Sequence, residues 1–342
     1  GQRRGIVAMA AVVGTIGLGL AAEAAPVNYQ MVTVGDAGNA ADVTGYGDVA
    51  YQYQIGKYDV TIGQYTAFLN AVAQSDPYGL YNIYMAINPE TAGISRAGSS
   101  GSYTYSVINN GGSSANRPIT YVSWFDAARF ANWMQNGQGN GGTETGAYTL
   151  VGGQTSGTAP AKNPGAQFFI PTENEWYKAA YYSPALNSGA GGYYGFATQA
   201  HASPGNAVGS GVNQANYYIY GPGFSVTQLP YYENGQNYLT DVGAFTDSAS
   251  FYGTFDQSGN VYQWNDLDGT LGSSRGLRGG FYNSIGAFDV SSSNHWTVTA
   301  SFENREAGFR LAGPASTPVP EIDPAGLGSV LALVTGALGL LE

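Results

Sequence analysis

The chain has 342 residues, which is enough for one large domain or two modest ones. Its 51 Gly, 27 Tyr and 14 Phe, with only 10% charged residues, exclude simple disorder and predict a loop-rich fold held by aromatic clusters. A formal net charge of -11 and the lack of a basic run argue against nucleic acid as a partner. The absence of cysteine excludes disulfides, thiolate nucleophiles and zinc–thiolate sites.

Residues 1–24 have the three parts of a secretory signal peptide. Arg3 and Arg4 form a positive region, an apolar stretch follows up to Leu20, and Ala22-Glu23-Ala24 fits the small-x-small cleavage pattern. We expect cleavage after Ala24; an uncleaved membrane anchor is the alternative, since the apolar stretch is long for a signal. The sequence does not begin with Met, so we expect that some residues precede it.

Residues 27–313 are predicted to form the folded domain, with three clear helices among short strands and loops. The helices begin at Thr61, Ser123 and Thr172, each followed by a capping residue three positions on and by an apolar stripe at helical spacing. Stretches rich in Gly, Ser and Asn separate them, at residues 98–116, 136–163 and 187–223. We interpret these stretches as long surface loops of a single α+β domain, because none has the character of a linker.

The C-terminal part is a proline-rich spacer, residues 314–324, followed by 17 apolar or small residues, 325–341. As a helix, that segment spans about 25 Å, close to the thickness of a bilayer core. It resembles a PEP-CTERM sorting tail, although Ile322 replaces the second proline and no basic cluster follows before Glu342, so we expect missing residues. The resemblance implies an exosortase partner and a Gram-negative cell envelope; a plain C-terminal membrane anchor is the alternative. Both interpretations place the domain outside the cytoplasm.

Six motifs occur in order along the domain. They are VTIGQY with FL (residues 60–69), RPITYVSW with DA (117–127), PTENEW (171–176), GNVYQW (259–264), RGGF (278–281) and GFR (308–310). Together they resemble the formylglycine-generating (sulfatase-modifying factor) family. The resemblance implies one compact α+β domain, low in regular secondary structure and related to C-type lectins. It also implies core positions for Trp124, Trp176 and Trp264, and loop-tying roles for Arg117, Arg278 and Arg310.

The resemblance implies two calcium sites in loops. The first carries over to Asn216, the Tyr217 backbone, Asn234 and the Gln236 backbone; the second to Asp256, Gly259 and Val261 (backbone) and Gln263. Gln263 replaces the usual glutamate, and this loss of charge weakens calcium binding. A hydrogen-bonded turn of the same shape, without an ion, is the alternative.

The resemblance also implies a catalytic copper(I) ion between two cysteines, whose positions correspond to about Ser284 and Asp289 here. Because copper(I) prefers soft thiolates, we expect no copper and no sulfatase-activating reaction. The two histidines are His201 and His295. A His295/Asp289 metal or acid–base site and a Ser284–His295–Asp289 triad are alternatives that we place behind a surface histidine with nothing bound.

The leading functional hypothesis is therefore a non-catalytic, exported module for ligand binding or structure. The resemblance implies a ligand groove along residues 281–304, with Tyr282, Asn283, Phe288, His295, Trp296 and Phe302 as its polar and aromatic lining. The ligand would be a peptide or a glycan, since exosortase-tailed proteins often accompany exopolysaccharide. The alternative is an oxidase of the formylglycine-generating type that acts on protein substrates through unconventional metal ligands.

Overall fold

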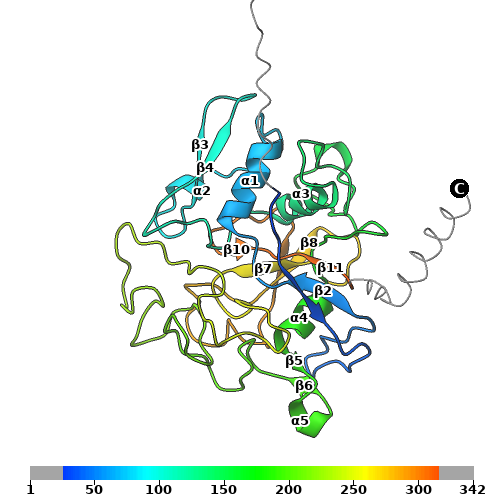
Figure 1. Cartoon of the computed structure of the whole chain (residues 1–342), viewed down its shortest axis with the longest axis vertical. Helices are drawn as coiled ribbons and strands as arrows, with labels where there is room; N and C mark the ends of the chain where they lie inside the picture. The colour runs from blue at the N-terminus through cyan, green and yellow to red at the C-terminus, as the bar shows by residue number, and fades with distance from the viewer. Residues whose placement is uncertain (1–25, 316–342) are drawn as a thin grey trace, which may run out of the picture.

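The structure is a computed structural model that describes residues 26–315. Its helices and strands are short and are joined by long loops (Figure 1). In chain order they are β1 (Met31–Val34), β2 (Tyr53–Gly56), α1 (Ile62–Val72), α2 (Tyr84–Ile87), β3 (Ile94–Ala97), β4 (Thr104–Val107), α3 (Trp124–Gln135), a 3-10 turn η1 (Val151–Gly153), α4 (Glu173–Tyr181), β5 (Tyr182–Ser183), α5 (Leu186–Gly189), β6 (Gly192–Tyr193), β7 (Tyr262–Asn265), β8 (Ser274–Arg278), β9 (Trp296–Thr299), β10 (Ala307–Gly308) and β11 (Ala312–Pro314).

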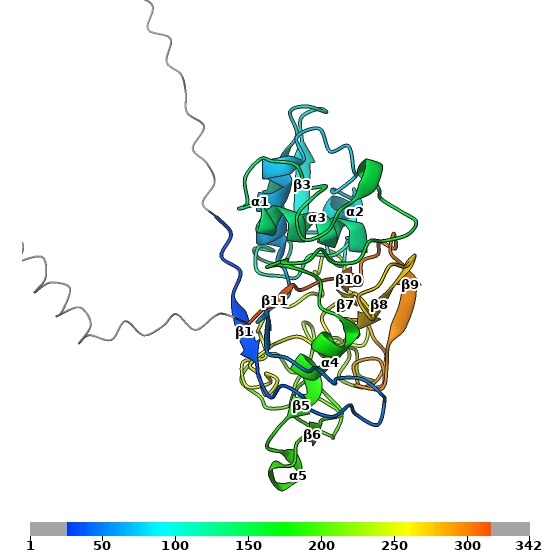
Figure 2. The same cartoon turned by 90° about the vertical axis from the view of Figure 1, so that its right-hand side faces the viewer.

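A four-stranded sheet in the order β10-β7-β8-β9 lies near the middle of the domain. Strands β7 and β8 are antiparallel, with Gln263 opposite Arg278, and β10 runs parallel to β7. In both views, α1 and α3 lie on one side of this sheet and α4 on the other (Figures 1 and 2). The sheet thereby joins the last three sequence motifs, which are separated along the chain.

A second sheet, in the order β1-β2-β11, brings the two ends of the described chain together. Ile55 in the central strand β2 lies opposite Val32 on one side and Ala312 on the other, both in antiparallel register. Its side chain is fully buried. The first and last strands of the described residues therefore lie in the same sheet.

The three predicted helices are confirmed, and each has a complete capping box. In α1, Gln64 N donates to Thr61 Oγ1, and Gln64 Oε1 accepts from Thr61 N. Ser123 and Asp126 make the same exchange at α3, as do Thr172 and Glu175 at α4. These bonds satisfy amides that have no partner within the helix. The short helices α2 and α5 were not predicted, because four residues are too few to show a helical period.

All three stretches predicted as surface loops lie partly inside the domain; in residues 136–163, for example, Tyr148 is fully buried. Residues 98–116 contain β4, whose Tyr105 is buried and donates its hydroxyl to Ala73 O at 2.7 Å. Residues 187–223 contain Asn206 and Tyr217, which are both buried. The prediction of surface loops was wrong there, because Gly and Asn mark the turns but do not show which residues between them pack inward.

The core consists largely of aromatic rings. Trp124, Trp176 and Trp264 are all fully buried, as predicted from the motifs. Phe130 joins α3 to the C-terminal strands through an edge-on contact with Phe309, at 5.4 Å between ring centroids. Such pairs add to the free energy of burial because the ring edges and faces carry opposite partial charges.

The predicted loop-tying arginines are also confirmed. Arg117 donates to the carbonyls of Asn110 and Gly111, and Arg278 to those of Ser292 and Asn294. Buried guanidinium groups offer several donors in a fixed geometry. They can therefore stabilise irregular loops that lack the regular backbone hydrogen bonds of a helix or sheet.

Asp126, at the start of α3, predicts a dependence of stability on pH. Burial raises its pKa from 3.8 to about 7; the Glu303 carboxylate adds to this shift, while Ser123 and Arg129 oppose it. Because the folded-state pKa exceeds the unfolded one, the stability that this group contributes is complete below about pH 4 and is lost as pH rises through about 7.

We therefore expect the free energy of unfolding of the wild type, relative to Asp126→Asn, to fall by about 1 kcal/mol or more between pH 4 and pH 8. Urea unfolding of both proteins across this range measures the difference. A difference that does not change with pH would contradict the assigned shift.

Within residues 26–315, no helix combines the length and the apolar character that a membrane span requires. The predicted signal peptide, residues 1–24, and the predicted tail helix, residues 325–341, lie outside the described residues. The spacer, 314–324, lies outside them except for its first two residues.

Candidate functional site

The two residues predicted at the cysteine positions, Ser284 and Asp289, lie close enough for the Ser284 hydroxyl to affect the pKa of Asp289. Ser284 is buried, and its Oγ accepts a hydrogen bond from Phe281 N at 3.1 Å. Burial raises the pKa of Asp289, and interaction with the Ser284 hydroxyl partly offsets that rise. Asn294 Nδ2 donates to Asp289 O at 3.1 Å and to Tyr262 Oη at 3.4 Å. These are hard oxygen groups, so the cluster does not fit copper(I), which prefers thiolates.

His295 does not join this cluster. Its side chain is exposed, and its ring contacts Tyr46 edge-on, with 5.6 Å between the centroids. No hydrogen bond connects it to Ser284 or Asp289 among residues 26–315. Nor do the described residues contain a group of three or more His, Asp or Glu arranged to hold a metal ion. Sequence proximity had suggested a triad, and the structure brings only two of its members together.

The predicted groove residues differ widely in exposure. Tyr282 is buried and donates its hydroxyl to Glu90 Oε2 at 2.5 Å, and Glu90 also pairs with Arg305 at 2.8 Å. Burial, followed by Glu90, raises the pKa of Tyr282. Phe302 packs on the core beside Trp264. These two side chains therefore support the fold beneath the surface.

The other four predicted groove residues reach the surface. Asn283 is half-buried, and His295 is exposed, as are Phe288 at 66% and Trp296 at 54%. None of the six lines the pocket described below.

The first predicted calcium set offers only neutral oxygens. Asn216 is buried, and its Nδ2 donates to Tyr238 O at 3.0 Å. The Tyr217 carbonyl already accepts from Asn206 Nδ2 at 3.0 Å, whereas Asn234 is exposed and Gln236 is half-buried. Calcium affinity rises with the number of charged ligands, so this set fits calcium only weakly.

The second predicted calcium set does not fit calcium. Gln263 Oε1 accepts from Arg310 Nε at 2.7 Å and from Trp176 Nε1 at 2.8 Å. Its Nε2 donates to Asp256 O at 2.7 Å. Gly259 and Val261 lie in the turn that leads into β7. The Arg310 guanidinium thus lies beside Gln263 Oε1, the oxygen that would bind the ion. The backbone carbonyl of Asp256 already accepts a hydrogen bond from the Gln263 side chain.

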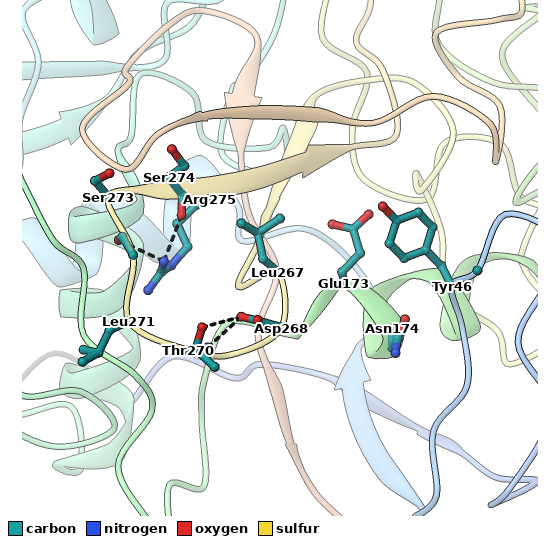
Figure 3. Close-up of a pocket in the computed structure, with 12 residues that line it drawn as sticks. Tyr46, Glu173, Asn174, Leu267, Asp268, Thr270, Leu271, Ser273, Ser274 and Arg275 are labelled. Carbon is teal, nitrogen blue, oxygen red and sulfur yellow. Dashed lines mark hydrogen bonds between the residues drawn. The ribbon is translucent and has the colours of Figure 1, made fainter.

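A pocket of about 560 Å³ lies between α4 and the loop that joins β7 to β8. It is lined by Gly45, Tyr46, Glu173, Asn174, Leu267, Asp268 and residues 270–275 (Figure 3). The lining comes from three segments: the β1–β2 loop, the first turn of α4, and the β7–β8 loop with the start of β8. Sequence analysis missed it; the polar turn Asp268-Gly269-Thr270 was the one local signal for it.

Two lining residues of this pocket, Glu173 and Arg275, form ion pairs with residues outside the lining. Glu173 Oε1 contacts Arg278 Nε, joining the PTENEW and RGGF motifs. Arg275 Nε lies 2.6 Å from Asp266 Oδ1. Burial raises the pKa of Asp266 to about 7, and Arg275 opposes that rise. Asp268, at the rim, has a lowered pKa because the hydroxyl and amide of Thr270 donate to its carboxylate.

Comparison with solved structures finds similar chains of low sequence identity. CarF is 20% identical with a TM-score of 0.48, and the match covers 84% of this chain and 98% of CarF. Variable protein 1 of Treponema denticola is 19% identical with a TM-score of 0.46, over 85% and 96% of the two chains. PvdO from Pseudomonas aeruginosa is 17% identical with a TM-score of 0.40, over 84% and 92%.

No curated protein matches this chain in sequence. The family model of the sulfatase-modifying factor enzyme 1-like domain matches residues 34–315. That match includes all six sequence motifs and most of the 342 residues. The chain therefore belongs to the formylglycine-generating enzyme-like, or sulfatase-modifying factor, domain family.

Proposed function

We propose that this chain is a ligand-binding or structural member of its family, without the oxidase activity that makes formylglycine. The observation that carries the proposal is that oxygen side chains, Ser284 and Asp289, stand at the positions predicted for the two cysteines. A hydroxyl and a carboxylate are hard ligands, whereas copper(I) is stabilised by soft sulfur. The chain has no cysteine elsewhere that could replace them.

The proposal predicts that copper binding can be restored by two substitutions. We expect wild type to bind no stoichiometric copper(I), and Ser284→Cys/Asp289→Cys to bind about one per chain, because the two side chains already interact. Either single variant should bind at least about tenfold more weakly than the double variant, since one thiolate is a poor site. Competition with a chromogenic copper(I) chelator measures all four proteins. Wild type that binds as tightly as the double variant would disprove the proposal.

Metal content and oxygen uptake test the oxidase hypothesis directly. The purified protein is analysed by elemental mass spectrometry as isolated, and its oxygen consumption is measured with a cysteine-containing peptide. Neither stoichiometric copper or iron nor oxygen uptake is expected. Finding a redox metal together with oxygen uptake would make the chain an enzyme with unconventional ligands.

Calcium is proposed as a weak ligand at the first set alone, around Asn216 and Asn234. The support is a cluster of amide and carbonyl oxygens without a carboxylate, which implies a dissociation constant no tighter than about 10⁻⁴ to 10⁻³ M. Elemental analysis after dialysis against calcium, then against buffer, tests it. Retention of calcium through the second dialysis would show tighter binding than this set explains.

The domain is further proposed to work outside the cytoplasm, tethered at least for a time by its C-terminal segment and handled by an exosortase. The support is sequence alone: the signal-like residues 1–24 and the tail-like residues 314–341. Fractionation of cells that produce the full chain tests the location. Recovery of the protein only from the cytoplasm would overturn it.

A further inference from the structure

The pocket between α4 and the β7–β8 loop contains a buried carboxylate oxygen without a partner. Glu173 is only 4% exposed; its Oε1 contacts Arg278 Nε, while its Oε2 and the Nη2 of the same arginine have no hydrogen-bond partner among residues 26–315. Leaving a buried acceptor unsatisfied is unfavourable, so a ligand that donates a hydrogen bond to it is favoured. Figure 3 shows Glu173 beside Tyr46, and both contact Arg278.

The other polar groups of the pocket include both donors and acceptors. The hydroxyls of Tyr46, Ser273 and Ser274 make no hydrogen bond with any described residue. Asp268 Oδ1 accepts from Thr270, which leaves Oδ2 available at the rim. Sugar hydroxyls both donate and accept, so they match such a mixture of carboxylate and hydroxyl groups.

The pocket does not suit an anion. Arg275 is the one basic residue in the lining, and its guanidinium already contacts four carbonyls and the Asp266 carboxylate. Nη1 donates to Gly272 O and Ser274 O, Nη2 to Ala159 O and Pro160 O, and Nε pairs with Asp266. A phosphate or carboxylate would therefore meet no free cation, and it would be repelled by Asp268.

Apolar surface complements these polar groups. Leu267 and Leu271 line the same pocket, and Leu271 is 68% exposed. The Tyr46 ring adds an aromatic face or edge on the opposite side, as Figure 3 shows. Sugar rings carry C–H groups that pack on such surfaces, and a pocket of about 560 Å³ lies within the range of roughly 300–1,000 Å³ typical of small-molecule sites.

We propose that this pocket binds a neutral sugar unit, with Glu173 and Asp268 accepting from its hydroxyls and Ser273, Ser274 and Tyr46 donating to them. The inference rests on the proposed binding function and deepens it by giving the ligand class and the place. The proposed ligand site is therefore the Glu173 pocket and not the surface at Phe288 and Trp296 that was predicted from the sequence.

Saturation-transfer NMR on the full chain tests the proposal, with glucose, galactose, mannose and their neutral disaccharides as probes. Ser273→Trp should fill the pocket from its rim, and Ser99→Trp, on the exposed turn between β3 and β4, is the matched control. We expect transfer to at least one neutral sugar, an affinity loss of tenfold or more in Ser273→Trp, and no loss in Ser99→Trp. Asp268→Asn, which keeps the shape of the rim, should weaken binding about threefold to tenfold by removing a charge-assisted hydrogen bond.

Three results would overturn the inference: no transfer to any neutral sugar, equal binding by Ser273→Trp, or tighter binding of glucuronic or sialic acid. Oxygen uptake and metal content, measured on the same preparation, report separately on the proposed function. If the protein binds no sugar and contains no redox metal, the non-catalytic binding function stands but its ligand is not a sugar. Sugar binding together with oxygen uptake would keep this site and reject the non-catalytic role.

Discussion

Replacing Arg310 by methionine is expected to destabilise the domain by about 3–5 kcal/mol, because it leaves a buried carboxylate without its cation. Arg310 is fully buried, and its Nη2 lies 3.1 Å from Oδ1 of Asp59, whose side chain is also fully buried. Its other donors reach Gly56 O, Phe255 O and Gln263 Oε1. Equilibrium unfolding in urea at pH 7 measures the loss.

The double variant Arg310→Met/Asp59→Asn is the control for this explanation. Burial raises the pKa of Asp59 and the Arg310 guanidinium opposes that rise, so removing the guanidinium raises the pKa further. The single variant should therefore lose stability more steeply than wild type as pH rises toward 8, since its folded state must hold a proton. Asp59→Asn should recover part of the loss and remove that extra slope. A loss below about 1 kcal/mol in the single variant would mean that the pair contributes little.

Trp264→Ala is the second change with a large expected effect, again about 3–5 kcal/mol. Trp264 lies in β7, is fully buried, and donates its indole N–H to Val122 O at 3.0 Å. Truncation removes a large apolar surface from the core and leaves the Val122 carbonyl unsatisfied in the interior. Thermal and urea unfolding of the variant report the change.

Trp296→Ala provides a matched comparison in the same sheet. Trp296 lies in β9 and is 54% exposed, so its truncation should change the unfolding free energy by no more than about 0.5 kcal/mol. Similar losses of unfolding free energy in the two variants would contradict the assignment of Trp264 to the core and Trp296 to the surface. If a peptide ligand binds at the surface predicted from sequence, Trp296→Ala should weaken it without affecting sugar binding at the Glu173 pocket.

Much of the scaffold was predictable because its signals are local. A capping box exchanges two hydrogen bonds between residues three positions apart, so Thr61, Ser123 and Thr172 marked their helices without tertiary information. The six ordered motifs indicated the family, and the lack of cysteine argued against a copper–thiolate centre at the level of composition.

The site could be decided only by tertiary structure, because its members come from distant segments. Glu173 and Arg278 are 105 positions apart, and their pairing depends on α4 packing against the central sheet. Likewise, Ser284 and Asp289 come together while His295, as close in sequence, packs against Tyr46. Residue type and spacing determined which groups were available in this protein, and long-range packing determined which of them meet, since burial and contact depend on neighbours that no local pattern contains.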